Sequence, residues 1–224
     1  MNILDAMQGR ASTRAFINKP VSRQTVWQIL DAARWAPSGT NTQPWQVAVV
    51  EGEVREQLCQ QMVDAFQQER PSNMDYQYYP KKITEPWRSR RFACGKALYD
   101  ALGIDRRDRQ GRNEQWIRNY HGFDAPVEMF VFIDETLQTD SWLDMGMFIQ
   151  NILLAAREFG LECCAQAAMA EYPDIVRATL QVPDLWKLIC GIAIGYPDRD
   201  APENQYRTER ESVDSFTSWH GFNG

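Results

Sequence analysis

Two arginines and a serine alternate near the start of the chain, at Arg10, Ser12 and Arg14. Side chains at alternate positions of an extended backbone point to the same side, so these three would converge on one partner. Together they offer several hydrogen-bond donors and two permanent positive charges, which suits a phosphate or another electron-rich anion. Because arginine-rich stretches are more often solvated surface, the pattern needs support from the rest of the sequence.

A second polar segment, residues 36–45, places short polar side chains in a turn just before an apolar run. Asn41 and Gln43 carry both a donor and an acceptor, so they can match a heterocycle edge that alternates N–H and C=O groups. Taken alone, a loop that joins a helix to a strand is the simpler interpretation of this segment.

A third segment, residues 204–210, carries Arg207 and Arg210 in the C-terminal tail. By itself it is typical of a solvated, charged coil. Next to the N-terminal arginines, it would bring further positive charge to a bound phosphate.

Protein-based acids and nucleophiles are scarce, because the chain has only two histidines, His121 and His220. Histidine-rich metal sites and Ser-His-Asp or Cys-His machinery therefore have few candidates, and we expect no metal site. The sequence also lacks a G-x-x-x-x-G-K-[ST] phosphate loop and a G-x-G-x-x-G motif after a strand, which argues against P-loop and Rossmann sites. An enzyme of this composition would depend on a cofactor, and an isoalloxazine held by other means stays open.

The composition limits the class of protein further. With 224 residues, 44% hydrophobic and 24% charged, the chain is typical of a globular domain. A net charge of −6 argues against nucleic acid as the main partner, and no apolar run approaches the roughly 20 residues of a membrane span. The first residues lack the features of a signal peptide, and the five cysteines include an adjacent pair but no C-x-x-C motif. We therefore expect a cytoplasmic protein with reduced thiols, and we expect Cys163 and Cys164 to be small buried hydrophobic residues.

The elements that must position these segments follow from hydrophobic periodicity. Helices and strands mix without strict βαβ alternation, which predicts an α+β fold. Ser22 is a plausible N-cap and Gly160 a plausible C-cap for two of the helices. Helices are expected from residue 23 to the turn at 37–39, over 53–68, 90–102 and 140–159, and after Pro173; strands are expected over 45–50, 127–134, 161–169 and 188–195.

No linker or repeat divides the chain, so we expect a single domain over residues 1–224. Residues 71–125 are rich in aromatic side chains and arginine, and such long excursions often cover binding sites. Residues 197–224 are polar and contain proline, and we expect them to form an extended C-terminal arm.

Taken in order, several segments resemble the FMN-dependent nitroreductases, from Arg10 to the C-terminus. The resemblance implies a nitroreductase-like α+β fold, with a central, mostly antiparallel sheet flanked by helices, and an intertwined homodimer with FMN at the subunit interface. The neighbourhood of Gln166 and the tail at 207–210 look closest to nitrobenzoate-reductase-like members, whereas the 71–125 cover matches none that we can place. The segments that carry the resemblance are residues 10–14, 36–45, 144–146, 150–156, 160–166 and 195–198, with Arg207 and Arg210.

The resemblance also implies which residues hold the flavin. Arg10 and Ser12 would hold the phosphate and ribityl chain, Arg14 would face the N1/C2=O side of the ring, and Arg207 or Arg210 would add charge at the phosphate. Two further groups are implied. Backbone groups of Ala165, Gln166 and Ala167 would lie near the N5 edge. The other subunit would contribute Pro37, Ser38, Gly39 and Asn41, with Gln43 nearby.

The implied activity is ping-pong hydride transfer from NAD(P)H, through flavin N5, to a nitroaromatic or quinone-like acceptor. No side chain acts as a catalytic acid or base in this scheme, and Arg14 gives electrostatic support to the reduced ring. Two alternatives stay open: another flavin reaction on the same fold, such as reductive dehalogenation or flavin cleavage, and a non-catalytic protein that stores or senses flavin.

Overall fold

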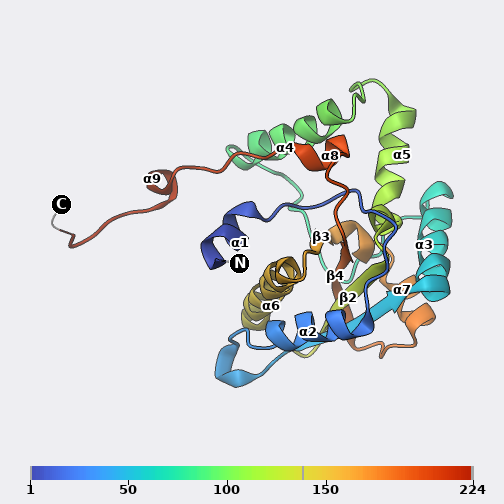
Figure 1. The fold of residues 1–224 in the computed structure, drawn as a ribbon, viewed down its shortest axis with the longest axis horizontal. Coiled ribbons are helices and arrows are strands. Elements are labelled where there is room, and N and C mark those ends of the chain that lie inside the picture. The colour runs from blue at the N-terminus through green and yellow to red at the C-terminus, as the bar shows by residue number, and fades with distance from the viewer. Residues whose placement is uncertain (1, 138, 223–224) are drawn as a thin grey trace.

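The computed structural model describes residues 2–137 and 139–222. In this part of the chain, a four-stranded antiparallel sheet lies at the centre, with helices packed on both faces (Figure 1). The α+β fold, with an antiparallel sheet flanked by helices, is therefore confirmed. The strands are β1 (Trp45–Glu51), β2 (Val127–Asp134), β3 (Glu162–Gln166) and β4 (Trp186–Gly195), in the order β1-β2-β4-β3.

The two central strands, β2 and β4, are buried along most of their length because helices cover both faces of the sheet. Successive side chains of β2 point to opposite faces, so the sheet divides the core into two layers. Met129 and Val131 belong to one layer, and Phe130 and Phe132 belong to the other.

Helices α2 (Arg23–Ala33) and α6 (Thr139–Glu158) cover the first face. The predicted N-cap of α2 is confirmed, since Ser22 Oγ accepts a hydrogen bond of 3.0 Å from the Thr25 N–H. Helix α6 fulfils the prediction for 140–159, and Gly160 follows it at φ +70°, a conformation that favours glycine.

Helices α3 (Gly52–Gln67), α5 (Arg109–Tyr120) and α7 (Pro173–Leu180) pack on the second face (Figure 1). The first and the last agree with the predicted helices. Helix α5 was not predicted from the sequence. Ile117 and Tyr120 reach the core, but most other positions of the helix are polar or charged, so its apolar face is too narrow to give a clear period.

Strand β3 is shorter than the strand expected over residues 161–169. It ends at Gln166, and a 3₁₀ turn, η3 (Ala167–Ala170), follows. In this turn Met169 packs directly against Gly191 of β4, where a Cβ atom would lie 2.6 Å from the Met169 Cβ. The absence of a side chain at Gly191 therefore lets the chain turn away from the sheet edge.

Because β3 pairs only with residues 191–195 of β4, the first half of β4 has an open edge. Two side chains at the start of the 71–125 region bind this edge. The Leu188 N–H donates to Asp75 Oδ2 at 2.8 Å, and the Tyr76 hydroxyl donates to the Ile189 carbonyl at 2.6 Å. The cover is thus attached to the sheet where it begins, before it continues into α4 (Trp87–Ala101).

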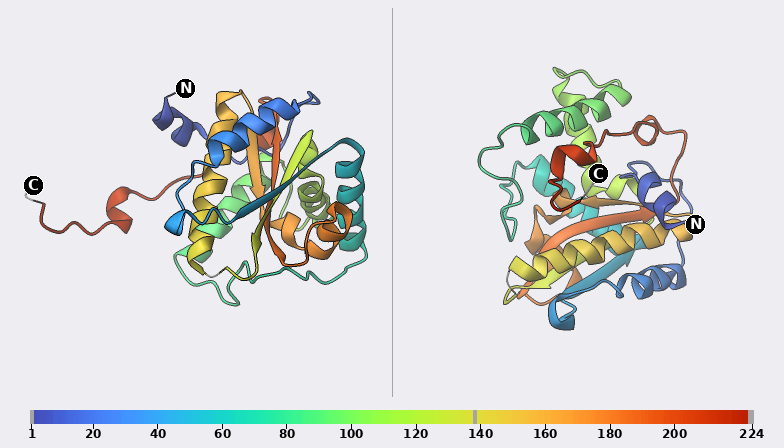
Figure 2. Two further views of the ribbon diagram at one scale, coloured as in Figure 1. Left: turned by 90° about the horizontal axis from the view of Figure 1, so that it is seen from below. Right: turned by 90° about the vertical axis from the view of Figure 1, so that its left-hand side faces the viewer.

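Both ends of the described chain leave the body (Figures 1 and 2). Helix α1 (Ile3–Gly9) was not predicted, and it stands beside the C-terminal end of α6. The tail was expected to be extended from residue 197. It includes two four-residue helices, α8 (Pro202–Gln205) and α9 (Val213–Phe216), joined by extended chain.

The cysteines are free thiols, four of them buried and Cys94 exposed. Burial raises the pKa of the adjacent Cys163 and Cys164, so both stay protonated near neutral pH. They act as small apolar residues, as expected, and the cytoplasmic location inferred from cysteine use stays a prediction.

Glu128, on β2, is a buried carboxyl group with only 1% of its surface exposed. The Cys59 thiol donates to its Oε2 at a sulfur–oxygen distance of 3.9 Å. Burial raises the pKa of Glu128 to about 7, although the positive charge of Arg55 opposes the shift. The folded state thus binds this proton more tightly than the unfolded state, and the protein loses stability as pH rises from the unfolded pKa through about 7.

We expect Glu128→Gln to gain stability relative to the wild type as the pH is raised from about 5 to about 8, by about 2–3 kcal/mol in free energy of unfolding. The amide keeps the shape but cannot ionise. Urea denaturation of both proteins at the two pH values measures this, and a stability difference that does not change with pH would contradict the prediction.

Candidate functional site

A pocket of about 620 Å³ opens between the N-terminal segment, the C-terminal tail and α4. Its lining includes four arginines and a single carboxylate, Glu203, which is paired with Arg118. The pocket is therefore strongly positive although the whole chain carries a net charge of −6. The lining residues are Met7, Gln8, Arg10, Ala11, Ser12, Thr13 and Arg14 of the N-terminal segment, Cys94 of α4, and Glu203, Asn204, Tyr206, Arg207, Thr208 and Arg210 of the tail.

The N-terminal segment runs along the free edge of β3. The Thr13 N–H donates to the Cys163 carbonyl at 3.1 Å, and Ser12 and Cys163 form a parallel bridge. Thr13 is buried, whereas Arg10, Ser12 and Arg14 are partly exposed at the pocket. The structure thus brings the three alternating residues of the sequence motif together.

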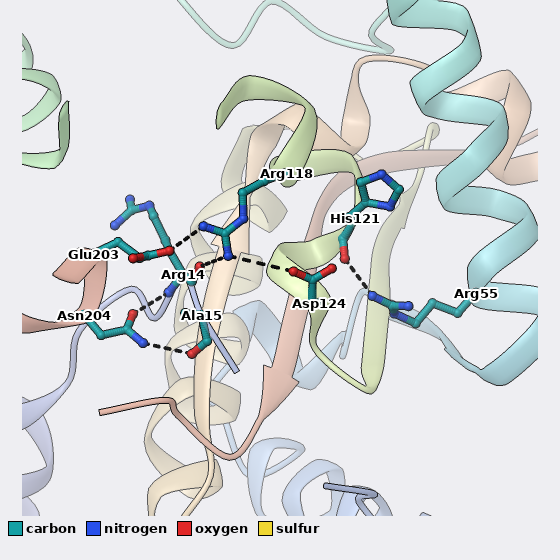
Figure 3. Close-up of polar contacts among 8 residues, drawn as sticks. All are labelled: Arg14, Ala15, Arg55, Arg118, His121, Asp124, Glu203 and Asn204. Carbon is teal, nitrogen blue, oxygen red and sulfur yellow. Dashed lines mark hydrogen bonds and ion pairs between the residues drawn. The ribbon is translucent and has the colours of Figure 1, made fainter. Parts of the chain in front are cut away.

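The tail forms hydrogen bonds with the backbone around Arg14, as Figure 3 shows. Asn204 Oδ1 accepts from the Arg14 N–H at 2.8 Å, and Asn204 Nδ2 donates to the Ala15 carbonyl at 2.8 Å. The Arg14 guanidinium donates to the Ser12 carbonyl and to the Tyr206 hydroxyl, each at 3.2 Å. Tyr206 and Asn204 lie within the charged segment noticed in the sequence, but nothing in that segment indicated which of its side chains would contact Arg14.

Arg207 and Arg210 both line the pocket, but their contacts differ. Arg207 Nη2 donates to the Gly9 carbonyl at 3.0 Å, which ties the tail to the N-terminal segment. Arg210 Nη1 donates to the carbonyl and hydroxyl of Thr208, within the tail itself.

Residues at the end of β3 lie further along the same edge. Ala165 is two residues beyond Cys163, roughly 7 Å along the strand, and is exposed. Gln166 is buried, with Nε2 donating to the Asn119 carbonyl at 2.9 Å, while its Oε1 has no partner among the described residues. Ala167 begins η3.

The loop that carries Pro37, Ser38, Gly39, Asn41 and Gln43 does not line this pocket. The loop is mostly exposed, and the Gly39 N–H donates to Asp144 Oδ2 of α6 at 3.1 Å. Within one chain, this loop therefore does not contribute to the pocket of the N-terminal arginines. Its predicted contribution to the flavin site of a second subunit stays a prediction.

The donor set of the pocket determines what it can bind. Guanidinium groups and side-chain hydroxyls suit an anion such as a phosphate. Among the described residues, no group of three or more His, Cys, Asp or Glu side chains could hold a metal ion. Within the same residues, no helix is both long and apolar enough to span a bilayer.

Comparison with known proteins agrees with this geometry. The family model described as the nitroreductase family matches residues 7–196. The nitrobenzene nitroreductase of Ectopseudomonas oleovorans is 35% identical over 217 residues, covering 96% of this chain and 95% of that protein. The 4-nitrobenzoate reductase of Pseudomonas putida is also 35% identical, over 95% of this chain and 93% of that protein.

A solved structure gives the same result. The FMN and NADPH-dependent nitroreductase NfnB from Sphigopyxis sp. strain HMH superposes with a TM-score of 0.95 at 41% identity, covering 99% of this chain and 100% of that chain. Sequence, fold and the convergence of Arg10, Ser12 and Arg14 at one pocket agree, and the chain belongs to the nitroreductase family.

Proposed function

We propose that this protein is an FMN-dependent oxidoreductase that uses NAD(P)H to reduce nitroaromatic or quinone-like acceptors. The observation that carries the proposal is the positive pocket on which Arg10, Ser12 and Arg14 converge with Arg207. Its volume of about 620 Å³ lies within the range of roughly 300–1,000 Å³ that is usual for small-molecule sites. Relatives whose names specify FMN and NADPH dependence, or reduction of nitrobenzene and 4-nitrobenzoate, support the same assignment.

Arg10 and Ser12 would hold the phosphate and ribityl chain of FMN. Arg207 would add a second cation at the phosphate, because its bond to the Gly9 carbonyl fixes it beside the N-terminal segment. Arg210 also lines the pocket, but its hydrogen bonds to the described residues lie within the tail, so none of them fixes it beside the N-terminal segment.

FMN bound in this pocket would supply the redox chemistry, which is hydride transfer from NAD(P)H and reduction of the acceptor. Arg14 would place a permanent positive charge at the N1/C2=O side, where the ring becomes more negative on reduction. Because the surrounding structure already fixes this guanidinium, little reorganisation is needed to stabilise that charge. Backbone groups of Ala165, which is exposed, and of Gln166 and Ala167 would lie near the N5 edge.

A second subunit would complete each site. The loop at Pro37, Ser38, Gly39, Asn41 and Gln43 is exposed and distant from the pocket of its own chain, so it is available to a partner. Large apolar side chains are also exposed on α1, in the α2 region and on the tail, which indicates an interface. They include Ile3 and Leu4 of α1, Trp27 and Trp35 of the α2 region, and Phe216 and Trp219 of the tail.

Purified protein should be yellow or become so with added FMN, and a nitroaromatic such as 4-nitrobenzoate should accelerate its oxidation of NADPH. Absorption spectra and anaerobic stopped-flow traces measure both steps. Protein that stays colourless in excess FMN would refute the proposal. Bound flavin that NADPH and NADH do not reduce would instead identify a storage or sensing protein.

Arg14→Ala should lower FMN affinity about 10- to 100-fold, because one charge-assisted contact is lost, and should lower the midpoint potential of the bound flavin. Equilibrium titration and redox titration measure the two effects. Arg112→Ala is the matched control, since Arg112 lies outside the pocket with its guanidinium 5.0 Å from the Tyr99 ring centroid. Equal FMN affinity in the two variants would show that Arg14 does not contact the flavin.

The protein should sediment at about twice its chain mass of 25.9 kDa. Trp35→Ser, which removes a side chain that is 75% exposed in the single chain, should shift the equilibrium towards monomer and lower FMN affinity in parallel. Analytical ultracentrifugation with flavin absorbance detects both. A wild-type monomer that retains FMN would contradict the shared site.

A further inference from the structure

Arg118, near the C-terminal end of α5, connects three parts of the chain that are distant in sequence (Figure 3). Its Nη2 donates to the Arg14 carbonyl at 3.0 Å, and its Nη1 forms a hydrogen-bonded ion pair with Glu203 of α8. Asp124 Oδ2 lies 3.8 Å from Nη2. A single guanidinium from the cover thus contacts the N-terminal segment and the tail at once.

The pair with Glu203 is not a loose surface contact. Only 6% of the Glu203 side chain is exposed, against 30% for Arg118. A carboxylate this deeply buried is costly unless it is paired and hydrogen-bonded, so the pair holds Arg118 in one orientation. The second arm of the guanidinium then points at the Arg14 carbonyl.

The peptide groups of Arg14 are consequently held from two sides. Asn204, next to Glu203 in α8, accepts from the Arg14 N–H, and Arg118 donates to the Arg14 carbonyl. Among the described residues, the Arg14 side chain donates two hydrogen bonds of 3.2 Å, to the Ser12 carbonyl and the Tyr206 hydroxyl. The direction of its guanidinium therefore depends on the held backbone as well as on these two bonds.

We propose that Arg118 is a positioning residue for the flavin site: by holding the Arg14 carbonyl while it neutralises Glu203, it sets the Arg14 guanidinium against the flavin ring and so tunes cofactor affinity and potential. This inference rests on the proposed function. It requires an arginine, because the planar fork serves two acceptors in fixed directions, whereas a lysine ammonium is a point charge on a flexible stem. Residues 71–125 would then influence the charge distribution at the flavin, through Arg118, in addition to covering the site.

Arg118→Lys separates geometry from charge, since lysine keeps the positive charge and can still neutralise Glu203. We expect FMN affinity to fall by about three- to tenfold, with reduced FMN losing more affinity than oxidised FMN, so that the midpoint potential falls. Arg112→Lys on the same helix is the control and should leave affinity and potential unchanged. Fluorescence titration with FMN, redox titration and thermal unfolding of the apo-protein measure these effects.

A double-mutant cycle tests whether Arg118 acts through Arg14. In an Arg14→Ala background there is no guanidinium to position, so adding Arg118→Lys should leave the potential at the value of Arg14→Ala alone. Should Arg118→Lys prove too unstable to purify, Glu203→Gln, which releases the other arm of the fork, should lower the potential in the same direction.

The outcomes distinguish the two proposals. Wild-type affinity and potential in Arg118→Lys, beside a lowered potential in Arg14→Ala, would overturn the role of Arg118 and leave the proposed function standing. An undiminished effect of Arg118→Lys in the Arg14→Ala background would also overturn it. Wild-type protein that binds no FMN would refute the proposed function, and this inference with it.

Discussion

The hydrogen bond from the Thr13 N–H to the Cys163 carbonyl joins the arginine-bearing segment to the edge of the sheet. This attachment fixes an extended backbone beside β3, so that Arg10, Ser12 and Arg14 reach the pocket while Thr13 packs inward. It also sets the distance from these residues to the exposed end of β3. A rigid sheet therefore holds both parts of the proposed flavin site, a geometry that a loop alone would not keep.

A carboxyl group on β3, that of Glu162, interacts electrostatically with Arg10 of this segment. Arg157 of α6 and Glu162 of β3 are nearly buried, with Nη1 and Oε1 3.5 Å apart. Burial raises the pKa of Glu162, while the positive charges of Arg157, Arg199, Arg207 and Arg10 oppose the shift. Gly9 leaves room for this pair, since a Cβ there would lie 2.7 Å from Arg157 Nη2. The cluster of arginines is thus balanced partly from within the protein.

Helices and strands with a clear hydrophobic periodicity were predictable from the sequence. The apolar stripes of α2 and α6, and the runs that form β1, β2 and β4, bury wide surfaces and so leave a clear pattern. Helix α5 buries only a narrow face, and β3 ends where a tertiary contact, Met169 on Gly191, decides the path of the chain. The same limit applies to the site. Arg10, Ser12 and Arg14 could be predicted from their spacing in the sequence. Arg118 and Asn204 contact the Arg14 backbone across about 100 and 190 residues of sequence, and no local pattern predicts such a contact.

The cover is fastened at both ends: Asp75 and Tyr76 bind the open edge of β4, and Arg118 and Asn119 bind the N-terminal segment and β3. The intervening stretch, including α4, is bound to neither sheet edge by these contacts. Replacement, lengthening or shortening of that stretch would leave the paired strands and the N-terminal arginines in place, but it would change the α4 side of the pocket, where Cys94 lies. One wall of the pocket can therefore vary in sequence and length while the sheet that carries the arginine segment stays the same.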